Sequence, residues 1–156
     1  MYGKPSPRGS GNGWSGWYKG WFFRSLRELS YVVGVLEKNM LGWRSAESRN
    51  LRMEYVLDGR SRTYFADFLV DDSILVEVKP KRLMGSKQNL AKRESALRFC
   101  EARGWLYRMV DVRILEEDVI VDLYRRGVVK FTSKYEAKMR AMLKKKRGKW
   151  YENEDG

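Results

Sequence analysis

The segment between residues 51 and 110 carries an ordered series of strand, turn and helix signals, and this series restricts the fold more than any other feature. Apolar residues alternate along 51–57, and Asp58-Gly59 is a two-residue hairpin signal. We expect a second strand over about 62–70, a turn at 71–73 and a third strand over 74–79. Pro80 ends that third strand, because proline has no N–H to donate to a ladder.

A helix is predicted over about 87–103, followed by a short strand at 105–110. Gly104 suits the position after the helix end, and the predicted buried side consists of Leu90, Ala91, Leu97 and Cys100. A strand, a helix and a strand in this order favour a crossover between parallel strands. We therefore predict an α/β fold with a mixed central sheet of about four or five strands flanked by helices.

An earlier helix is predicted to begin at Ser25 and to end within 39–42. Ser25 and Glu28 fit a capping box, with Ser at the N-cap and Glu three residues later. The apolar face expected for this helix is made by Leu26, Leu29, Val33, Leu36 and Met40.

Three parts are expected along the chain: a flexible Gly/Trp-rich arm at 1–20, a core at 21–115 and a helical basic tail at 116–156. In the arm, Trp14, Trp17 and Tyr18 lie among basic residues, so they are able to stack on nucleic-acid bases. The alternative, which we favour, is that the arm tryptophans dock on the domain. In the tail, helices are predicted near 116–126 and 134–146.

The charge of the chain points to a polyanionic partner. Lys and Arg number 32 and Asp and Glu 20, which gives a net charge of +12, and nucleic acid is the simplest partner for such a balance. The chain has no His and one Cys, which excludes disulfide scaffolds, zinc fingers and catalytic triads that need His. No apolar run is long enough for a membrane span, and no secretory signal is expected at the N-terminus.

The residues that carry chemistry are Asp67, Glu77 and Lys79. Glu77 and Lys79 share one face of the third strand, because residues two apart in a strand point the same way. A hairpin symmetric about Asp72 places Asp67 directly opposite Glu77, whereas a turn centred between Asp71 and Asp72 shifts the register by one. Opposed carboxylates repel one another and favour a bound Mg²⁺ or Mn²⁺, which can activate water for phosphodiester hydrolysis. The alternative is an ordinary pair of solvated strand charges.

This pattern resembles the PD-(D/E)XK nuclease superfamily, with Ala66 where that family usually has Pro. The segments Tyr64–Leu69 and Val76–Pro80 are most similar to TnsA-type transposon endonucleases, and also to phage endonuclease I and head-completion nucleases. The resemblance covers about residues 20–110 and implies a restriction-endonuclease-like core. It implies that Asp67, Glu77 and Glu28 bind the metal and that Lys79 is the catalytic lysine, with 5′-phosphate and 3′-hydroxyl products. Glu28 has a plain helix-cap role as its alternative.

The sequence thus predicts a metal-dependent DNA endonuclease encoded by a phage or mobile element, with a non-catalytic DNA-binding head component as the alternative. The resemblance implies the cytoplasm of a bacterial or phage-infected cell, or association with a virion. A homodimer and a phage or transposition partner protein both stay open. Basic residues near the site and in the tail are candidates for contact with DNA phosphates: Arg24, Arg27, Lys81, Lys87, Lys92, Arg93, Lys144, Lys145, Lys146 and Arg147.

Overall fold

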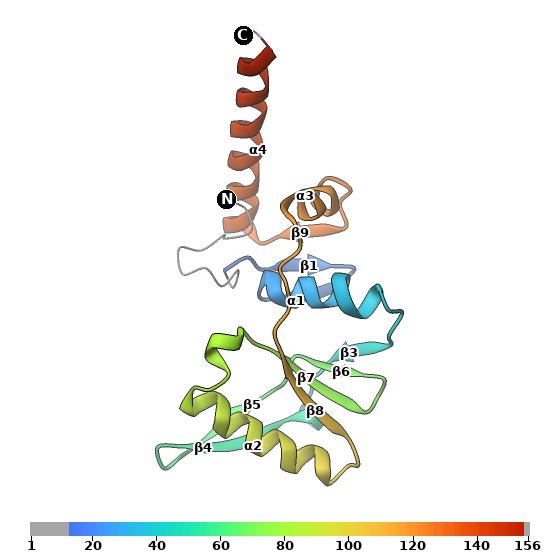
Figure 1. The fold of residues 1–156 in the computed structure, drawn as a ribbon, viewed down its shortest axis with the longest axis vertical. Helices are drawn as coiled ribbons and strands as arrows, with labels where there is room; N and C mark the ends of the chain where they lie inside the picture. The colour runs from blue at the N-terminus through green and yellow to red at the C-terminus, as the bar shows by residue number, and fades with distance from the viewer. Residues whose placement is uncertain (1–12, 155–156) are drawn as a thin grey trace. The chain divides into compact units, whose positions relative to one another are not determined.

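A computed structural model describes residues 13–154, and these divide into two compact units (Figure 1). The core unit is Arg27–Ile114, and the terminal unit combines the described residues up to 26 with those from 115 onward. Each unit is described by itself below. No helix in the described part of the chain has the length and apolar character needed to cross a membrane.

The core unit is built on a mixed four-stranded sheet in the order β3-β6-β7-β8. Its strands are β3 (Trp43–Ser45), β6 (Phe68–Val70), β7 (Ile74–Val78) and β8 (Leu106–Val110). The β3–β6 and β6–β7 pairs are antiparallel, whereas β7 and β8 run parallel. The predicted α/β class and the parallel crossover into β8 are both confirmed.

The predicted strand over 62–70 is wrong, because this segment forms two strands in different sheets. β4 (Met53–Leu57) and β5 (Arg60–Tyr64) form a separate hairpin. Its turn is Asp58-Gly59, and both residues have positive φ, 52° and 75°, as a tight hairpin turn of this kind requires. The chain then leaves the ladder at Phe65–Asp67 and re-enters another sheet as β6. This break positions Asp67, as shown below.

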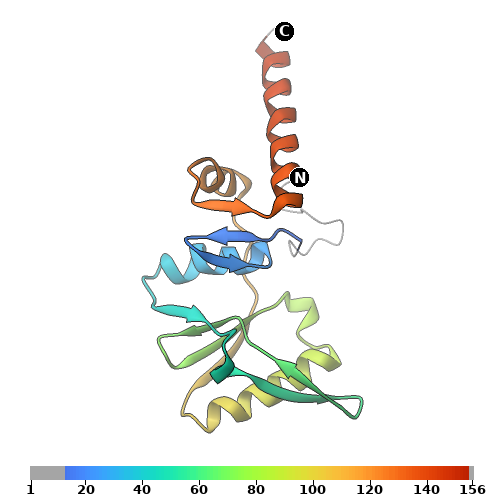
Figure 2. The same ribbon diagram turned by 180° about the vertical axis from the view of Figure 1, so that it is seen from behind.

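Helix α2 (Lys87–Glu101) packs against β4 and β8 (Figures 1 and 2). The Ser86 side chain caps the helix by accepting a hydrogen bond from the backbone N–H of Asn89. The predicted buried side is wrong for Leu90 and Leu97, which are exposed. Cys100 is buried, as predicted, and Asn89, Ser95 and Ala96 are buried in place of the two leucines. The Asn89 side chain donates to the Leu83 carbonyl and the Ser95 hydroxyl to the Glu54 carbonyl. These two hydrogen bonds therefore fix which side of α2 faces the protein interior.

Helix α1 (Leu26–Tyr31) begins directly after Ser25, as predicted, and continues as a π-helical segment, Val32–Glu37. Leu26, Leu29 and Leu36 are fully buried, but Val32 takes the inward place predicted for Val33. Steps of three and of four residues both stay on one helix face, so Val32 and Val33 each fit between Leu29 and Leu36 by periodicity alone. Met40 lies beyond the helix and is 91% exposed, so its predicted place on the apolar face is wrong.

The terminal unit contains a three-stranded antiparallel sheet in the order β2-β1-β9. Its strands are β1 (Gly16–Tyr18), β2 (Trp21–Phe23) and β9 (Val129–Phe131), and its helices are α3 (Glu117–Arg125) and α4 (Ser133–Glu154). Both helices contact β9, and α4 runs on as one helix (Figure 1). At Gly16 a Cβ atom would lie 2.2 Å from the Lys130 carbonyl oxygen, so only glycine allows β1 and β9 to approach this closely.

The predicted flexible arm differs from the structure over residues 13–20. Trp14 and Tyr18 are each 4% exposed, and Trp14 packs against Phe131 and Tyr135 at ring-centroid distances of 5.2 Å. Two of the three arm aromatics therefore dock on the unit, as the favoured alternative proposed. The rest of the predicted arm, 1–12, lies outside the described residues.

Candidate active site

Asp67 lies at the break between β5 and β6, and three hydrogen bonds fix it. Its backbone N–H donates to the Val76 carbonyl at 3.0 Å, and its carbonyl accepts from the Ala46 N–H at 3.0 Å. Its side-chain Oδ2 accepts from the Val78 N–H at 2.7 Å. The carboxylate thus occupies the place at which a backbone carbonyl would continue the ladder, so its position is set by the sheet itself.

Glu77 and Lys79 come from the end of β7. Glu77 is 5% exposed, and Lys79 follows the strand with its N–H bonded to the Val110 carbonyl at 2.8 Å. Lys79 Nζ lies 3.6 Å from Glu77 Oε2. The two side chains therefore share a face, as strand periodicity predicts.

The register of the β6–β7 hairpin is the one that is symmetric about Asp72. Phe68 pairs with Val76 and Val70 with Ile74. Asp71 and Asp72 have φ of 50° and 54°, and the Ser73 N–H closes the turn onto the Val70 carbonyl. The last pair of the ladder is Phe68 with Val76, so Asp67 and Glu77 lie just outside it. Asp67 instead contacts β7 through the hydrogen bond that its side chain accepts from the Val78 N–H.

The pKa values of both carboxylates are raised. For Asp67, burial raises the pKa well above its ordinary range, and the charges of Glu77 and Glu28 raise it further. The Val78 N–H bond and Lys79 oppose that shift. For Glu77, burial again raises the pKa, while Lys79, Lys92 and the Tyr64 hydroxyl lower it. Burial is thus the main reason that both pKa values are raised, and it disfavours the charged forms of the two carboxylates.

A buried pair of tyrosines supports Glu77, and the sequence analysis missed it. The Tyr64 hydroxyl donates to Glu77 Oε1 at 3.2 Å, and the Tyr64 and Tyr107 hydroxyls lie 3.0 Å apart. Tyr64 is 3% exposed and Tyr107 5%. The sequence gives little signal for this pair, because β5 is exposed at every residue except Tyr64 and no spacing rule joins two tyrosines that lie 43 residues apart.

Glu28 lies in α1, in the same unit, and is partly buried. Its charge contributes to the raised pKa of Asp67, so the helix brings this carboxylate to the neighbourhood of the pair. Its role as a metal ligand stays a prediction.

The donor set fits a hard divalent cation. Glu77 is buried and Asp67 partly buried, and both carboxylates have raised pKa values. With no His in the chain they form an oxygen-only site, which suits Mg²⁺ or Mn²⁺. Asp67 Oδ2 and Glu77 Oε1 accept hydrogen bonds, while Asp67 Oδ1 accepts none from the described residues. Within those residues no cluster of three or more His, Cys, Asp or Glu has the arrangement of a metal site. A pair suffices for Mg²⁺, which is commonly held by one or two carboxylates plus water and substrate phosphate.

Of the predicted phosphate-binding residues of the core unit, three have partners within the protein. Arg27 forms an ion pair with Asp111 and donates to the Val112 carbonyl, and Lys87 pairs with Asp58. Lys92 Nζ lies 5.1 Å from the centre of the Tyr64 ring, and its charge lowers the pKa of Glu77. Lys92 therefore borders the site. Lys81 and Arg93 have exposed side chains.

The remaining predicted residues belong to the terminal unit. Arg24 is exposed, with its guanidinium 5.7 Å from the centre of the Phe22 ring. Lys144 and Lys145 are exposed on α4. Lys146 forms an ion pair with Glu117 of α3, which reduces its capacity to meet a phosphate.

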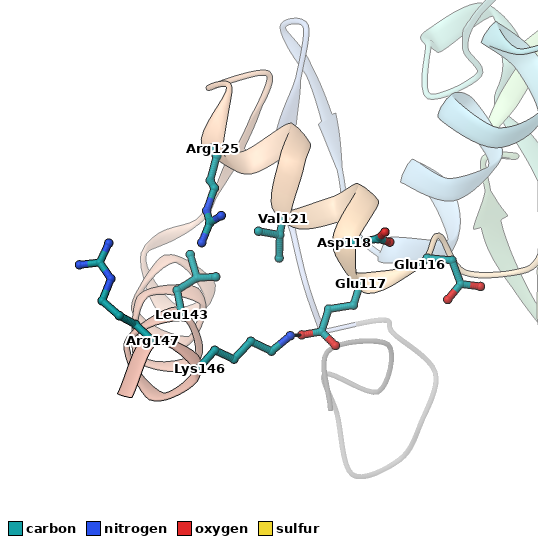
Figure 3. Close-up of a pocket in the computed structure, with 8 residues that line it drawn as sticks. All are labelled: Glu116, Glu117, Asp118, Val121, Arg125, Leu143, Lys146 and Arg147. Atoms are coloured by element: carbon teal, nitrogen blue, oxygen red, sulfur yellow. Dashed lines mark hydrogen bonds and ion pairs between the residues drawn. The ribbon is translucent and has the colours of Figure 1, made fainter. Parts of the chain in front are cut away.

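A hollow of about 680 Å³ between α3 and α4 contains this ion pair (Figure 3). Glu116, Glu117 and Asp118 line it from the α3 side, and Lys146 and Arg147 from α4. Figure 3 shows Lys146 reaching to Glu117, with Val121 and Leu143 beside them. Acidic side chains from α3 and basic side chains from α4 thus face one another in this hollow.

Comparison with known proteins agrees with this geometry. Residues 37–111 match the family model described as "TnsA-like endonuclease N terminal". The predicted resemblance to TnsA-type endonucleases is confirmed. The match contains Asp67, Glu77 and Lys79, whereas Glu28 and the terminal unit lie outside it. No curated protein and no solved structure matches the chain.

Proposed function

We propose that this protein is a metal-dependent endonuclease that hydrolyses phosphodiester bonds in DNA, with Asp67, Glu77 and Lys79 as its reactive centre. The observation that carries the proposal is the pairing of buried Glu77 with partly buried Asp67, with Lys79 Nζ 3.6 Å from Glu77 Oε2. Its place within the segment that matches the TnsA-like endonuclease family supports the same function.

Each residue of the centre has a task that its contacts support. Asp67, fixed by the Val78 N–H, and Glu77, fixed by the Tyr64 hydroxyl, would hold the cation, with Glu28 as a further carboxylate. When bound, Mg²⁺ or Mn²⁺ polarises the phosphate and lowers the pKa of a coordinated water. Lys79 would orient the attacking water or stabilise the negative charge that develops on the phosphoryl oxygens.

DNA is the proposed substrate because the net charge is +12 and the matched family is one of endonucleases. Exposed cations on both units, including Lys81, Arg93, Lys144 and Lys145, would contact its phosphates. An origin in a phage or mobile element is part of the same proposal and rests on the resemblance of the catalytic segment.

A nicking assay tests this function. Supercoiled, linear and branched DNA would be incubated with the full chain in Mg²⁺, in Mn²⁺ and in EDTA. We expect cleavage of at least one form with either cation and none in EDTA. Cleavage that persists in EDTA contradicts the metal dependence, and no cleavage of any form favours a non-catalytic DNA-binding component.

A matched pair of lysine variants assigns the chemistry. Lys79→Ala removes the site lysine, whereas Lys81→Ala removes an exposed lysine two residues later. At saturating protein only Lys79→Ala should abolish cleavage. Equal rates for the two variants contradict the assignment of Lys79.

A further inference from the structure

The outer face of the terminal sheet carries an aligned row of two aromatic side chains and one lysine. Trp17 of β1 pairs with Phe22 of β2 on one side and with Lys130 of β9 on the other. The Trp17 and Phe22 ring centroids are 5.3 Å apart. Because neighbouring residues on a strand point to opposite faces, these three side chains lie on the face opposite Tyr18 and Phe131.

This face is exposed, whereas the opposite face forms the core of the unit. Trp17 is 44% exposed and Phe22 38%, against 4% for Tyr18 and 6% for Phe131. A tryptophan with nearly half of its surface in water contributes less to folding than a fully buried one. Trp17 is thus the one described aromatic of the predicted arm that does not dock, and its exposure calls for another explanation.

The strands that form this face, together with the residues that flank them, carry cations and no acidic residue. Lys130 lies on β9, while Lys19 and Arg24 flank β1 and β2. Arg126, before β9, forms an ion pair with Asp122 of α3. Beside Trp17 lies a hollow of about 650 Å³, lined by Trp17, Lys19, Gly20, Gly127, Val128 and Lys130. The face therefore combines flat aromatic surface, an adjoining hollow and positive charge.

We propose that this face binds single-stranded DNA, with an unpaired base stacked on Trp17 or Phe22 and the neighbouring phosphates on Lys19, Arg24 and Lys130. Aromatic side chains interleaved with cations are the usual means of holding single strands, because every base offers a π-face and every nucleotide a phosphate. A duplex hides its base faces by stacking, so the aromatic pair distinguishes unpaired DNA from duplex. The proposal concerns binding alone and stands or falls separately from hydrolysis.

Fluorescence anisotropy of labelled DNA tests the proposal in the full chain, with EDTA present to prevent cleavage. Labelled oligo-dT and a hairpin duplex of the same charge would be titrated with wild type, Trp17→Ala, Trp17→Phe and Val119→Ala. Val119 is the matched control, since it is 38% exposed and lies on α3 of the same unit. Thermal unfolding of each variant verifies that it is folded.

We expect Trp17→Ala to weaken oligo-dT binding about tenfold, in line with the loss of one base-stacking contact. Duplex binding should stay within twofold, Trp17→Phe should keep most of the affinity, and Val119→Ala should behave as wild type. An unchanged affinity for oligo-dT in Trp17→Ala overturns the proposal, as does an equal loss for single strand and duplex. Self-association that Trp17→Ala abolishes, without any effect on DNA, also overturns it and makes the face an interface between copies.

Discussion

The two units of this protein treat charge and aromatic surface in opposite ways. In the core unit, Asp67 and Glu77 are held within the sheet by hydrogen bonds from Val78 and Tyr64, at the cost of raised pKa values. In the terminal unit, Trp17, Phe22 and several lysines lie open to solvent on secondary structure that is otherwise well packed. Carboxylates with shifted pKa values are typical of catalytic sites. Exposed aromatic side chains are typical of surfaces that bind a partner. On our proposal the chemistry belongs to the core unit, and the exposed surface of the terminal unit adds DNA affinity to that of the exposed core-unit cations.

The largest effect that separates the units is expected for Lys79→Ala. Loss of the ammonium next to Glu77 should lower single-turnover cleavage about 10²–10³-fold, as does removal of other groups that stabilise transition-state charge. DNA affinity should change less than about twofold, because one cation among 32 is lost. Rapid-quench cleavage and anisotropy on the same preparation measure both quantities. An equal loss of cleavage rate and of DNA affinity would contradict the view that Lys79 serves the chemistry and not the binding.

Binding of the divalent cation should depend on Asp67. Asp67→Asn keeps an oxygen that can accept from the Val78 N–H but removes the charge, so affinity for Mn²⁺ should fall by more than about tenfold. Isothermal titration calorimetry measures this change, with Asp72→Asn on the exposed hairpin turn as the matched control. Equal Mn²⁺ affinity in wild type and Asp67→Asn would exclude Asp67 as a ligand.

The tail should contribute salt-dependent affinity without contributing chemistry. Lys144 and Lys145 are exposed, and each phosphate contact adds about 0.9 to the slope of log K against log salt on duplex DNA. The double variant Lys144→Ala/Lys145→Ala should therefore flatten that slope by about 2, whereas Lys146→Ala should change it less because Lys146 pairs with Glu117. Filter binding over a range of salt concentrations measures the slopes. An unchanged slope in the double variant would mean that these two lysines do not contact DNA phosphates.

The smallest effect concerns stability in the absence of metal. The folded pKa values of Asp67 and Glu77 are raised, so between the unfolded and folded values the native state binds more protons than the unfolded chain. Stability contributed by these groups is thus present at acidic pH and is lost as pH rises. Asp67→Asn should raise the Tm by about 2–4 °C at pH 8 for each kcal/mol of strain relieved, and less at pH 5. Calorimetry in EDTA measures this difference, and a lower Tm for the variant at pH 8 would mean that the charged carboxylate stabilises the apo protein.

Local patterns predicted part of the candidate site. The strand alternation of 74–79 placed Glu77 and Lys79 on one face, and of the two registers that the turn left open, the structure has the one symmetric about Asp72. What local patterns missed depends on partners distant in sequence. The break at Phe65–Asp67 arises because β5 and β6 pair with different strands, and Tyr107 reaches Tyr64 only through the parallel crossover.

The terminal sheet escaped prediction for a related reason. β1 and β2 are three residues each, and β1 pairs with β9 more than 100 residues later. The Gly-rich composition of 1–20 favoured a flexible segment, but Gly16 instead permits the close approach of β1 to β9. Composition reports the average character of a segment and does not show which glycine a strand pair requires.

A single-turnover nicking titration tests the central claim most directly. Wild type, Lys79→Ala and Lys144→Ala/Lys145→Ala would be titrated against supercoiled DNA in Mn²⁺, and each titration gives a maximal rate and a half-saturating concentration. The account predicts that the Lys79 variant loses maximal rate at unchanged half-saturation, and that the tail variant keeps its maximal rate but needs more protein. A full maximal rate in the Lys79 variant, or a lost one in the tail variant, would contradict the assignment of chemistry to the core unit.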